Sequence, residues 1–311
     1  MTIYRLEELS TAQLERLDRS KSVVVLAVSP LEEHGPHLPL GVDGFTAQHF
    51  AQALALRITR ERPGWQVVLA PPLFLGSFTF DGAGSVAVRQ RVVRDLVLDY
   101  GSALARAGFR YILISNGHGG PGHLVALEEA ARRVSRKYGV AMTSFTGRLA
   151  WEFLRGKYLD KIEAALGRQL DPAERRAFNE DAHGGWWETS MMLLLRPELV
   201  DPGYRDLPPA RYSLPERLRP NYPVRGGRPG YVGHPALADP DFARASARVL
   251  EDQAMELVRA ILDGTLKPAA RRSIFYAIPF FRTNFWPVAE TLAMAGAGLL
   301  GWWVSRKVPR G

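Results

Sequence analysis

Cysteine is absent from the 311-residue sequence, and histidine is scarce, with seven residues. Without cysteine the chain cannot form a disulfide, a Cys-ligated zinc site, an iron–sulfur cluster or a thiol nucleophile. Any metal site must therefore use histidine and carboxylate ligands. Hydrophobic residues make up 46% and charged residues 23% of the chain, which is typical of a folded protein.

Most of the chain also lacks an excess of positive charge, although the formal net charge is +8. Residues 264–311 contain seven Lys and Arg residues and one acid, so residues 1–263 are nearly neutral. No basic stripe remains there, and we expect no nucleic-acid partner. The N-terminal segment has no apolar run and carries acids early, so we expect no signal peptide and a cytoplasmic catalytic domain.

Strand and helix patterns alternate along the chain. The β-branched run at 22–29 predicts a buried strand, because such runs are typical of parallel sheets. Further strands are predicted at 66–70, 110–115 and 140–145, and helices at 45–59, 86–107, 123–137 and 242–262. This alternation indicates an α/β domain with a largely parallel sheet, whose sites lie at the carboxyl ends of the strands.

A basic and apolar tail, residues 266–311, follows the predicted domain at 1–265. The segment 288–304 is apolar except for Glu290 and Thr291, and tryptophans and basic residues flank it, as at a membrane interface. As a helix it would be roughly 25 Å long, which is marginal for a hydrocarbon core of about 30 Å. Two interpretations stay open: a membrane-associated or transmembrane helix formed by residues 286–304, or an apolar helix buried in an oligomer contact.

The first cluster of reactive residues follows the first predicted strand. Glu32 and His34 are two residues apart, so in an extended segment they point the same way. Asp43 follows a turn containing glycine and proline, just before a helix, and its carboxylate can bridge two cations. The alternative is that Asp43 only caps the helix and His34 is a loop histidine.

A second cluster, Asn116-Gly-His118-Gly-Gly, follows the third predicted strand. His118 can point into the same crevice as the first cluster, and glycines such as Gly119 allow the backbone to approach a ligand closely. The turn lacks the lysine and spacing of a phosphate-binding loop.

A third cluster contains His183 and Glu188. Glu188 opens a predicted helix, where it can complete a metal shell, and His183 can act as a proton shuttle. The alternative is that Glu188 is a first-turn acid favoured by the helix dipole.

Together these motifs resemble the creatininase (creatinine amidohydrolase) family over roughly residues 20–265. The resemblance rests on Glu32-x-His34-Gly-Pro-His37-Leu-Pro with Asp43, Asn116-Gly-His118-Gly-Gly, His183-x4-Glu188-Thr-Ser and Gly230-Tyr-Val-Gly-His234-Pro. It implies a three-layer α/β/α fold, a homo-oligomer such as a hexamer, and hydrolysis of a non-peptide or cyclic amide C–N bond in a small molecule. It also implies a site for divalent metal, often two ions per subunit, of zinc, manganese or iron.

Carried over residue by residue, the resemblance places Glu32, His34, Asp43 and His118 at metal-ligand positions, with Asp43 as the bridge. His183 falls on the position of the catalytic histidine. His37 belongs to the first motif and is a candidate for substrate contact, as are Gly119 and three tryptophans. For Trp151, Trp186 and Trp187, packing in the core or in a lid is an equal alternative.

Some positions depart from creatininase itself. Gly120 stands where that enzyme has a glutamate ligand, two residues after the histidine matched by His118. We infer that Glu188 supplies the missing carboxylate, as a metal ligand that also takes part in catalysis. Relatives with the His-Gly-Gly form include mycofactocin-precursor peptidases and a formamidopyrimidine deformylase. Further departures, at Pro121, Ser85 and His234, also argue against creatinine as the substrate.

The leading prediction is a hydrolase in which metal ions activate water and His183 donates a proton to the leaving nitrogen. A second enzyme is possible on the same residues: a metallopeptidase that trims a small modified peptide. The alternative of a different class is a membrane-tethered binding protein that keeps the fold without catalysis. The intact set of metal-ligand residues disfavours it.

Overall fold

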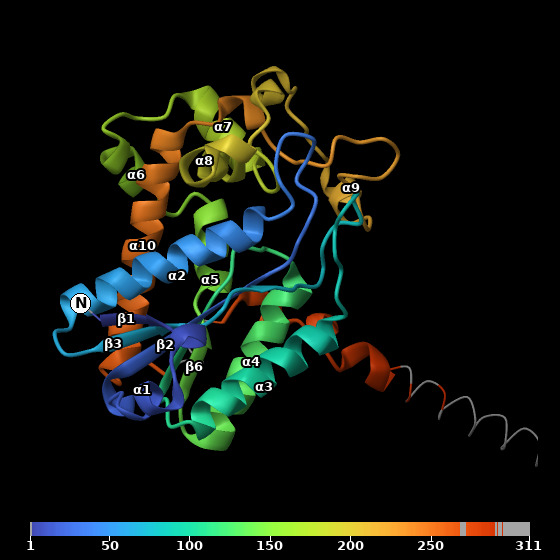
Figure 1. The fold of residues 1–311 in the computed structure, drawn as a ribbon. Helices are drawn as coiled ribbons and strands as arrows, with labels where there is room; N and C mark the ends of the chain where they lie inside the picture. Colours follow the sequence, from blue (N-terminus) through green and yellow to red (C-terminus); the bar gives the residue numbers. More distant parts are fainter. Residues whose placement is uncertain (1, 268–271, 290, 292–293, 295–311) are drawn as a thin grey trace, which may run out of the picture.

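The computed structural model describes residues 2–267, 272–289, 291 and 294 (Figure 1). Its strands are β1 (Thr2–Arg5), β2 (Ser22–Ser29), β3 (Gln66–Leu69), β4 (Leu73–Phe74), β5 (Tyr111–Ser115) and β6 (Ala141–Ser144). Its α-helices are α1 (Thr11–Glu15), α2 (Val42–Glu61), α3 (Gln90–Arg106), α4 (Pro121–Tyr138), α5 (Thr146–Leu154), α6 (Leu159–Leu166), α7 (Pro172–Glu180), α8 (Trp186–Leu195), α9 (Leu214–Arg217) and α10 (Pro240–Leu262).

The strands form a six-stranded sheet in the order β1-β3-β2-β5-β6, with β4 paired to the end of β2. Each pairing is parallel. All eight residues of β2 are buried, since this strand lies in the middle of the sheet. The predicted α/β class with a largely parallel sheet is confirmed.

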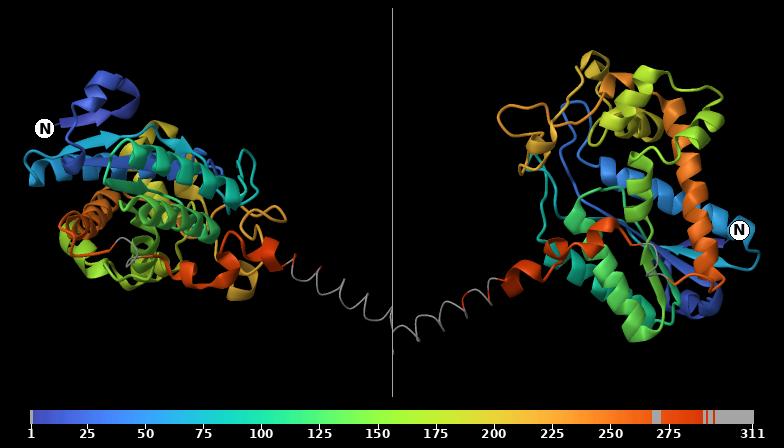
Figure 2. Two further views of the ribbon diagram at one scale, coloured as in Figure 1. Left: turned by 90° about the horizontal axis from the view of Figure 1, so that it is seen from below. Right: turned by 180° about the vertical axis from the view of Figure 1, so that it is seen from behind.

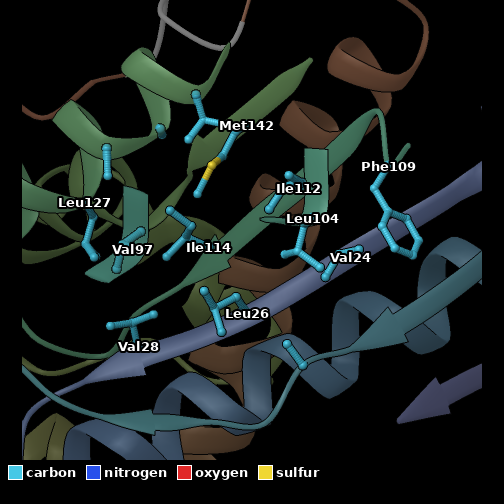
Figure 3. Close-up of a cluster of buried hydrophobic side chains, with 14 of the residues drawn as sticks. Val24, Leu26, Val28, Val97, Leu104, Phe109, Ile112, Ile114, Leu127 and Met142 are labelled. Carbon is cyan, nitrogen blue, oxygen red and sulfur yellow. The ribbon is translucent and has the colours of Figure 1, made fainter. Parts of the chain in front are cut away.

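Helices cover both faces of the sheet, and the alternation of side chains along β2 serves both layers. Val24 and Leu26 pack toward α3 and α4 in one apolar cluster (Figure 3). Val23 and Val25 point the opposite way, into a cluster with α2 and α10. The three-layer α/β/α arrangement is therefore confirmed, and Figure 2 shows the layers from two further sides. A further apolar cluster joins α5 to α8 with α10.

Local sequence sets the ends of the helices that carry the site. Helix α4 begins with Pro121, whose fixed φ suits a first helical position, and ends at Gly139. Gly139 has a φ of 67°, and its N–H bonds back to Ser135 O, which satisfies a terminal carbonyl. Helix α2 begins at Val42, earlier than predicted, so Asp43 lies inside its first turn and is not the N-cap residue.

The described part of the tail packs on the body beside α4 (Figure 1). Two 3-10 helices, η7 (Ile274–Ala277) and η8 (Pro279–Phe281), contact α4. Arg282 Nε donates to Glu129 Oε1 at 2.7 Å, and Ser273 N–H donates to Glu128 Oε1 at 2.6 Å. Residues 272–282 are therefore fixed to the α/β body.

The prediction of a membrane-associated or transmembrane helix is corrected. Among the described residues, no helix combines the length and the apolar character needed to cross a membrane. The apolar run at 288–304 is only marginally long for a helix that crosses a membrane. Most of it, at residues 290, 292–293 and 295–304, lies outside the described residues, as does most of the predicted apolar C-terminal helix.

Candidate metal centre and active site

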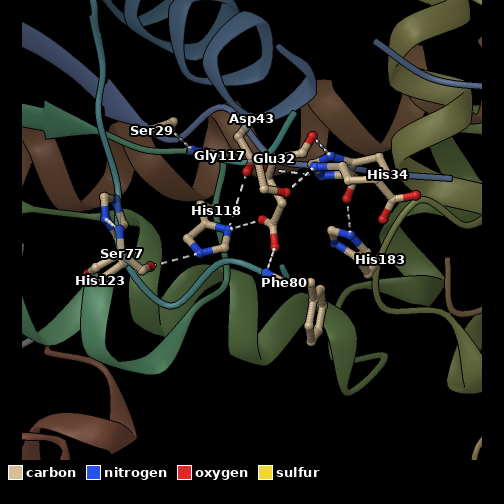
Figure 4. A network of polar contacts seen from close by, with 12 residues as sticks. Ser29, Glu32, His34, Asp43, Ser77, Phe80, Gly117, His118, His123 and His183 are labelled. Carbon is tan, nitrogen blue, oxygen red and sulfur yellow. Dashed lines mark hydrogen bonds and ion pairs between the residues drawn. The ribbon is translucent and has the colours of Figure 1, made fainter. Parts of the chain in front are cut away.

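Three turns and the start of α2 deliver acidic and histidine side chains to the carboxyl edge of the sheet (Figure 4). One turn follows β2, one follows β5, and one leads into α8. Because β2 and β5 are hydrogen-bonded neighbours, the turns that follow them start side by side. The predicted residues that come together are Glu32, His34, Asp43, His118, His183 and Glu188.

Glu32, Asp43 and His118 form one group of possible ligand atoms. His118 Nδ1 lies 3.0 Å from Glu32 Oε2 and 3.2 Å from Asp43 Oδ2. The second oxygen of Glu32 accepts a hydrogen bond from the N–H of Phe80 at 2.6 Å. This bond holds the carboxylate with Oε2 directed at the other two residues.

His34, Asp43 and Glu188 form a second group. His34 Nε2 lies 3.5 Å from Asp43 Oδ1 and 3.6 Å from Glu188 Oε2. Glu188 Oε2 also accepts a hydrogen bond from the N–H of Gly184 at 2.5 Å. Asp43 thus directs one oxygen to each group, which is the arrangement of a carboxylate that bridges two cations.

The histidines are oriented by main-chain carbonyls. His34, His118 and His183 each place one ring nitrogen within hydrogen-bond distance of a carbonyl oxygen. His34 Nδ1 lies 2.9 Å from Glu32 O, and His118 Nε2 lies 3.2 Å from Ser77 O. His183 Nε2 lies 2.7 Å from Glu33 O. A carbonyl can only accept, so that nitrogen carries the hydrogen, and in the neutral ring the other nitrogen keeps a lone pair. Histidines that bind metals are held in this way.

Buried polar atoms without partners mark the same place. Among the described residues, Glu32 Oε2, His34 Nε2 and Asp43 Oδ2 have no hydrogen-bond partner, although all three side chains are buried. Leaving such groups unpaired is costly, and cations bound by the two groups would satisfy all three. The ligand atoms of each group lie within 4.8 Å of one another, and imidazole with carboxylate suits zinc, manganese or iron. The residues therefore fit the implied metal.

The electrostatics of the cluster favour added positive charge. Burial opposes the charged form of His34, but Glu188 and Asp43 outweigh it and raise its pKa to about 10. Burial also opposes the charged form of His118, yet Glu32 and Asp43 raise its pKa well above the usual value. The three carboxylates thus draw protons onto both rings, and a cation could replace those protons.

His183 lies against the second group, where its ring centroid is 4.2 Å from that of His34. Burial, reinforced by the charge of His34, lowers the pKa of His183 to about 4, so the ring is neutral at pH 7. With Glu32 and His34 it also forms a third possible ligand set. The position suits either a proton carrier or a ligand.

Comparison with known proteins places the chain in a family. The family model described as creatininase, creatinine amidohydrolase, matches residues 7–261. The chain belongs to the creatininase family.

The relatives to which this chain is similar include a protein named as a peptidase and one named as an amidohydrolase. The chain is 30% identical over 203 residues to the mycofactocin precursor peptide peptidase of Mycobacterium ulcerans, covering 63% of this chain and 67% of that protein. It is 30% identical over 230 residues to the creatinine amidohydrolase of Pseudomonas putida, covering 69% and 80%. A solved structure of "Creatininase Mn" superposes with a TM-score of 0.64 at 21% identity, covering 84% and 99%, and supports the fold.

The turn at Gly120 leaves no room for a side chain. A Cβ atom there would lie 2.3 Å from His118 Nε2 and 2.9 Å from the carbonyl oxygen of Phe78, so a glutamate does not fit this turn as it is folded. Glu188 reaches the cluster from α8 instead. Gly119 differs, since a Cβ there would meet no atom within 4 Å, and its backbone borders a cavity.

The four aromatic and histidine side chains predicted to contact substrate lie in different surroundings. Trp187 lines that cavity beside Glu188. Trp186 is only 1% exposed and stacks on Phe242, with ring centroids 4.4 Å apart, which favours core packing. Trp151 lies on α5 against Phe275 and Arg155. His37 is buried, and its Nε2 is 2.8 Å from Thr189 Oγ1.

Some contributors to the site were not predicted from the sequence. Main-chain groups of Ser77, Phe80 and Glu33 hold the side chains of the cluster, and no residue type signals such a role. Asp181 accepts hydrogen bonds from the N–H groups of Trp186 and Trp187, so it fixes the start of α8 that carries Glu188. Asp181 lies four residues before the N-cap residue Gly185, outside the position at which a capping pattern is recognised, so no local signal in the sequence identifies its role.

Proposed function

We propose that the chain is a divalent-metal-dependent hydrolase of a non-standard or cyclic amide C–N bond in a small molecule. The observation that carries the proposal is the pair of ligand groups that share Asp43, in which Glu32 Oε2, His34 Nε2 and Asp43 Oδ2 are buried without a hydrogen-bond partner among the described residues. We further propose Glu32, Asp43 and His118 as ligands of one ion, and His34, Asp43 and Glu188 as ligands of a second.

The metal ligands, His183 and Gly119 have different proposed roles in catalysis. Metal ions held by these ligands would polarise the scissile carbonyl and lower the pKa of a water molecule toward neutrality. His183 keeps its Nε2 hydrogen on Glu33 O, so Nδ1 of the neutral ring can take a proton and pass it to the leaving nitrogen. The short turn at Gly119 leaves open space beside the cluster for the substrate.

A second candidate function is the trimming of a small modified peptide. It is favoured by the 30% identity to a mycofactocin precursor peptide peptidase. The packing around Gly120, which excludes the glutamate of creatininase, argues against creatinine itself as the substrate. Assembly into a homo-oligomer is a further proposal that rests on the family.

The test begins with the metal content of the full chain, purified without chelators and measured by plasma mass spectrometry. We expect one to two divalent ions per chain. The protein is then incubated with Mn, Zn or Fe and a panel of cyclic amides, including creatinine, formamides and short peptides. We expect hydrolysis of at least one C–N bond, abolished in Glu32→Gln and retained in Glu128→Gln, a buried glutamate outside the cluster.

Distinct outcomes separate the alternatives. Less than about one ion per chain would contradict the hydrolase proposal. Cleavage of peptides alone would favour the peptidase. Bound metal without hydrolysis of any compound would favour a binding protein that keeps the fold. His183→Ala should retain metal but lose turnover, and full turnover would remove His183 from catalysis.

A further inference from the structure

A small cavity lies directly beside the ligand cluster, with a volume of about 80 Å³. Its polar end is made by the turn after β5, which also carries His118, and by Glu188, a member of the second ligand group. A molecule whose reacting bond sits at the cluster can place an adjoining group in this cavity, because Glu188 borders both. The cavity thus bears on which substrates can be bound.

Most of the wall is apolar and comes from α2, α5, α8 and α10. Helix α5 lies between α10 and α4 (Figure 1). Trp187 directs its indole N–H away, since Nε1 donates to Ser246 Oγ at 3.1 Å, so the ring offers the cavity an apolar face. The apolar lining includes Phe50, Leu149, Ala150, Phe153, Trp187 and Leu250.

Charge in the cavity is confined to its polar end. Among the described residues that line it, Glu188 is the one ionisable residue, and Glu188 faces His34 in the cluster. A charged substrate group placed against the apolar wall would lose its hydration without gaining a partner. Thr46 offers one polar contact, because its buried Oγ1 lacks a hydrogen-bond partner among the described residues.

The volume limits the size of the bound group. A dry apolar cavity of about 150 Å³ accommodates benzene. This cavity, at about 80 Å³, has roughly half that volume and so encloses a smaller group. A branched aliphatic group of a few carbons fits, while a fused aromatic ring system does not. The lining residues and the volume therefore point to the same chemical class.

We infer that the substrate carries a neutral aliphatic group of about three to five carbons next to the scissile bond, and that this cavity binds it. The inference rests on the proposed hydrolase function, because it assumes that the bond to be cut sits at the cluster. It goes beyond that function by naming the class of substrate.

Alkyl hydroxamates test the inference without knowledge of the substrate, because a hydroxamate chelates a divalent ion and projects its alkyl group beside it. The probes are acetohydroxamate, 3-methylbutanohydroxamate and the charged succinic monohydroxamate, titrated calorimetrically into the Mn-loaded full chain of measured metal content. Three added carbons in an apolar cavity should tighten binding roughly tenfold or more. The succinic compound should bind no better than acetohydroxamate.

Two variants localise the effect. Ala150→Leu adds a side chain to the cavity wall and should remove the preference for 3-methylbutanohydroxamate while keeping acetohydroxamate binding. Ala103→Leu makes the same change at an exposed position of α3 and should leave the preference intact. Equal affinity for the two alkyl probes, or an unaltered preference in Ala150→Leu, would overturn the inference while the metal content still supports a hydrolase. A chain without bound metal would contradict the proposed function and, with it, this inference.

Discussion

Two sets of buried acids on neighbouring segments of the protein differ in how they are satisfied. In the ligand cluster, Glu32 and Asp43 each have a buried oxygen with no hydrogen-bond partner among the described residues. On α4, Glu128 accepts two hydrogen bonds from Ser273, through N–H at 2.6 Å and Oγ at 3.0 Å. Glu129 pairs with Arg282 at 2.7 Å.

The difference separates acids whose hydrogen-bond or ion-pair partners belong to the chain from acids that have an unpaired oxygen available to a metal ion. Glu128 and Glu129 attach the C-terminal segment to α4, so the chain itself supplies their partners, although one oxygen of Glu129 has only the guanidinium of Arg94 at 3.9 Å. The acids of the cluster face each other and two histidines, an arrangement stable only if protons or metal ions offset the charge. Burial of an acid alone therefore does not identify a functional site.

The largest expected effect is that of Asp43→Asn, which removes the residue common to both ligand groups. We expect loss of most bound metal and at least a 100-fold loss of hydrolysis, since even residues behind the ligands contribute 10–100-fold. Metal analysis and turnover of the substrate found in the screen measure this. Glu128→Gln is the matched buried control and should retain both properties. Unchanged metal content in Asp43→Asn would remove the distinction between the two sets of acids.

Metal removal is expected to have the next largest effect. A ligand present at 100 to 1,000 times its Kd stabilises the native state by about 3–4 kcal/mol, so a chelator should lower the Tm by several degrees at pH 7. The change should vanish in Asp43→Asn and persist in Glu128→Gln. If the wild-type protein binds metal but its Tm is unchanged after the chelator is added, the cluster does not need a cation for stability.

Much of the ligand cluster could be predicted from sequence, because it depends on topology. Parallel strands end at one edge of the sheet, so Glu32 after β2 and His118 after β5 had to meet there. The burial of Trp186 could not be predicted, since a tryptophan beside a motif looks the same whether it meets Phe242 or a substrate. The docking of Arg282 onto α4 joins residues 153 positions apart, and no local pattern encodes such a contact.

The contribution of Glu128 to stability should also depend on pH. Burial outweighs the hydrogen bonds from Ser273 and raises the pKa of Glu128 from 4.5 to about 7. Its contribution to stability is therefore fully present below about pH 4.5 and lost as pH rises through 7. Glu128→Gln should gain up to about 3 kcal/mol relative to wild type between pH 4.5 and 8. Denaturant midpoints of metal-loaded samples at both pH values measure this, and a constant difference would contradict the raised pKa.

The smallest expected effect concerns the ion pair that fastens the C-terminal segment. Arg282→Met leaves Glu129 buried without its nearest cation, and since Arg282 is itself about one-third exposed, we expect a loss of about 1–2 kcal/mol of unfolding free energy. Arg211→Met breaks an exposed pair with Glu180 and should cost less than about 1 kcal/mol. Because Arg282 lies outside the ligand cluster, metal content should be unchanged in both variants. Loss of metal in Arg282→Met alone would mean that the C-terminal segment also supports the cluster, and that the two sets of acids are coupled through α4.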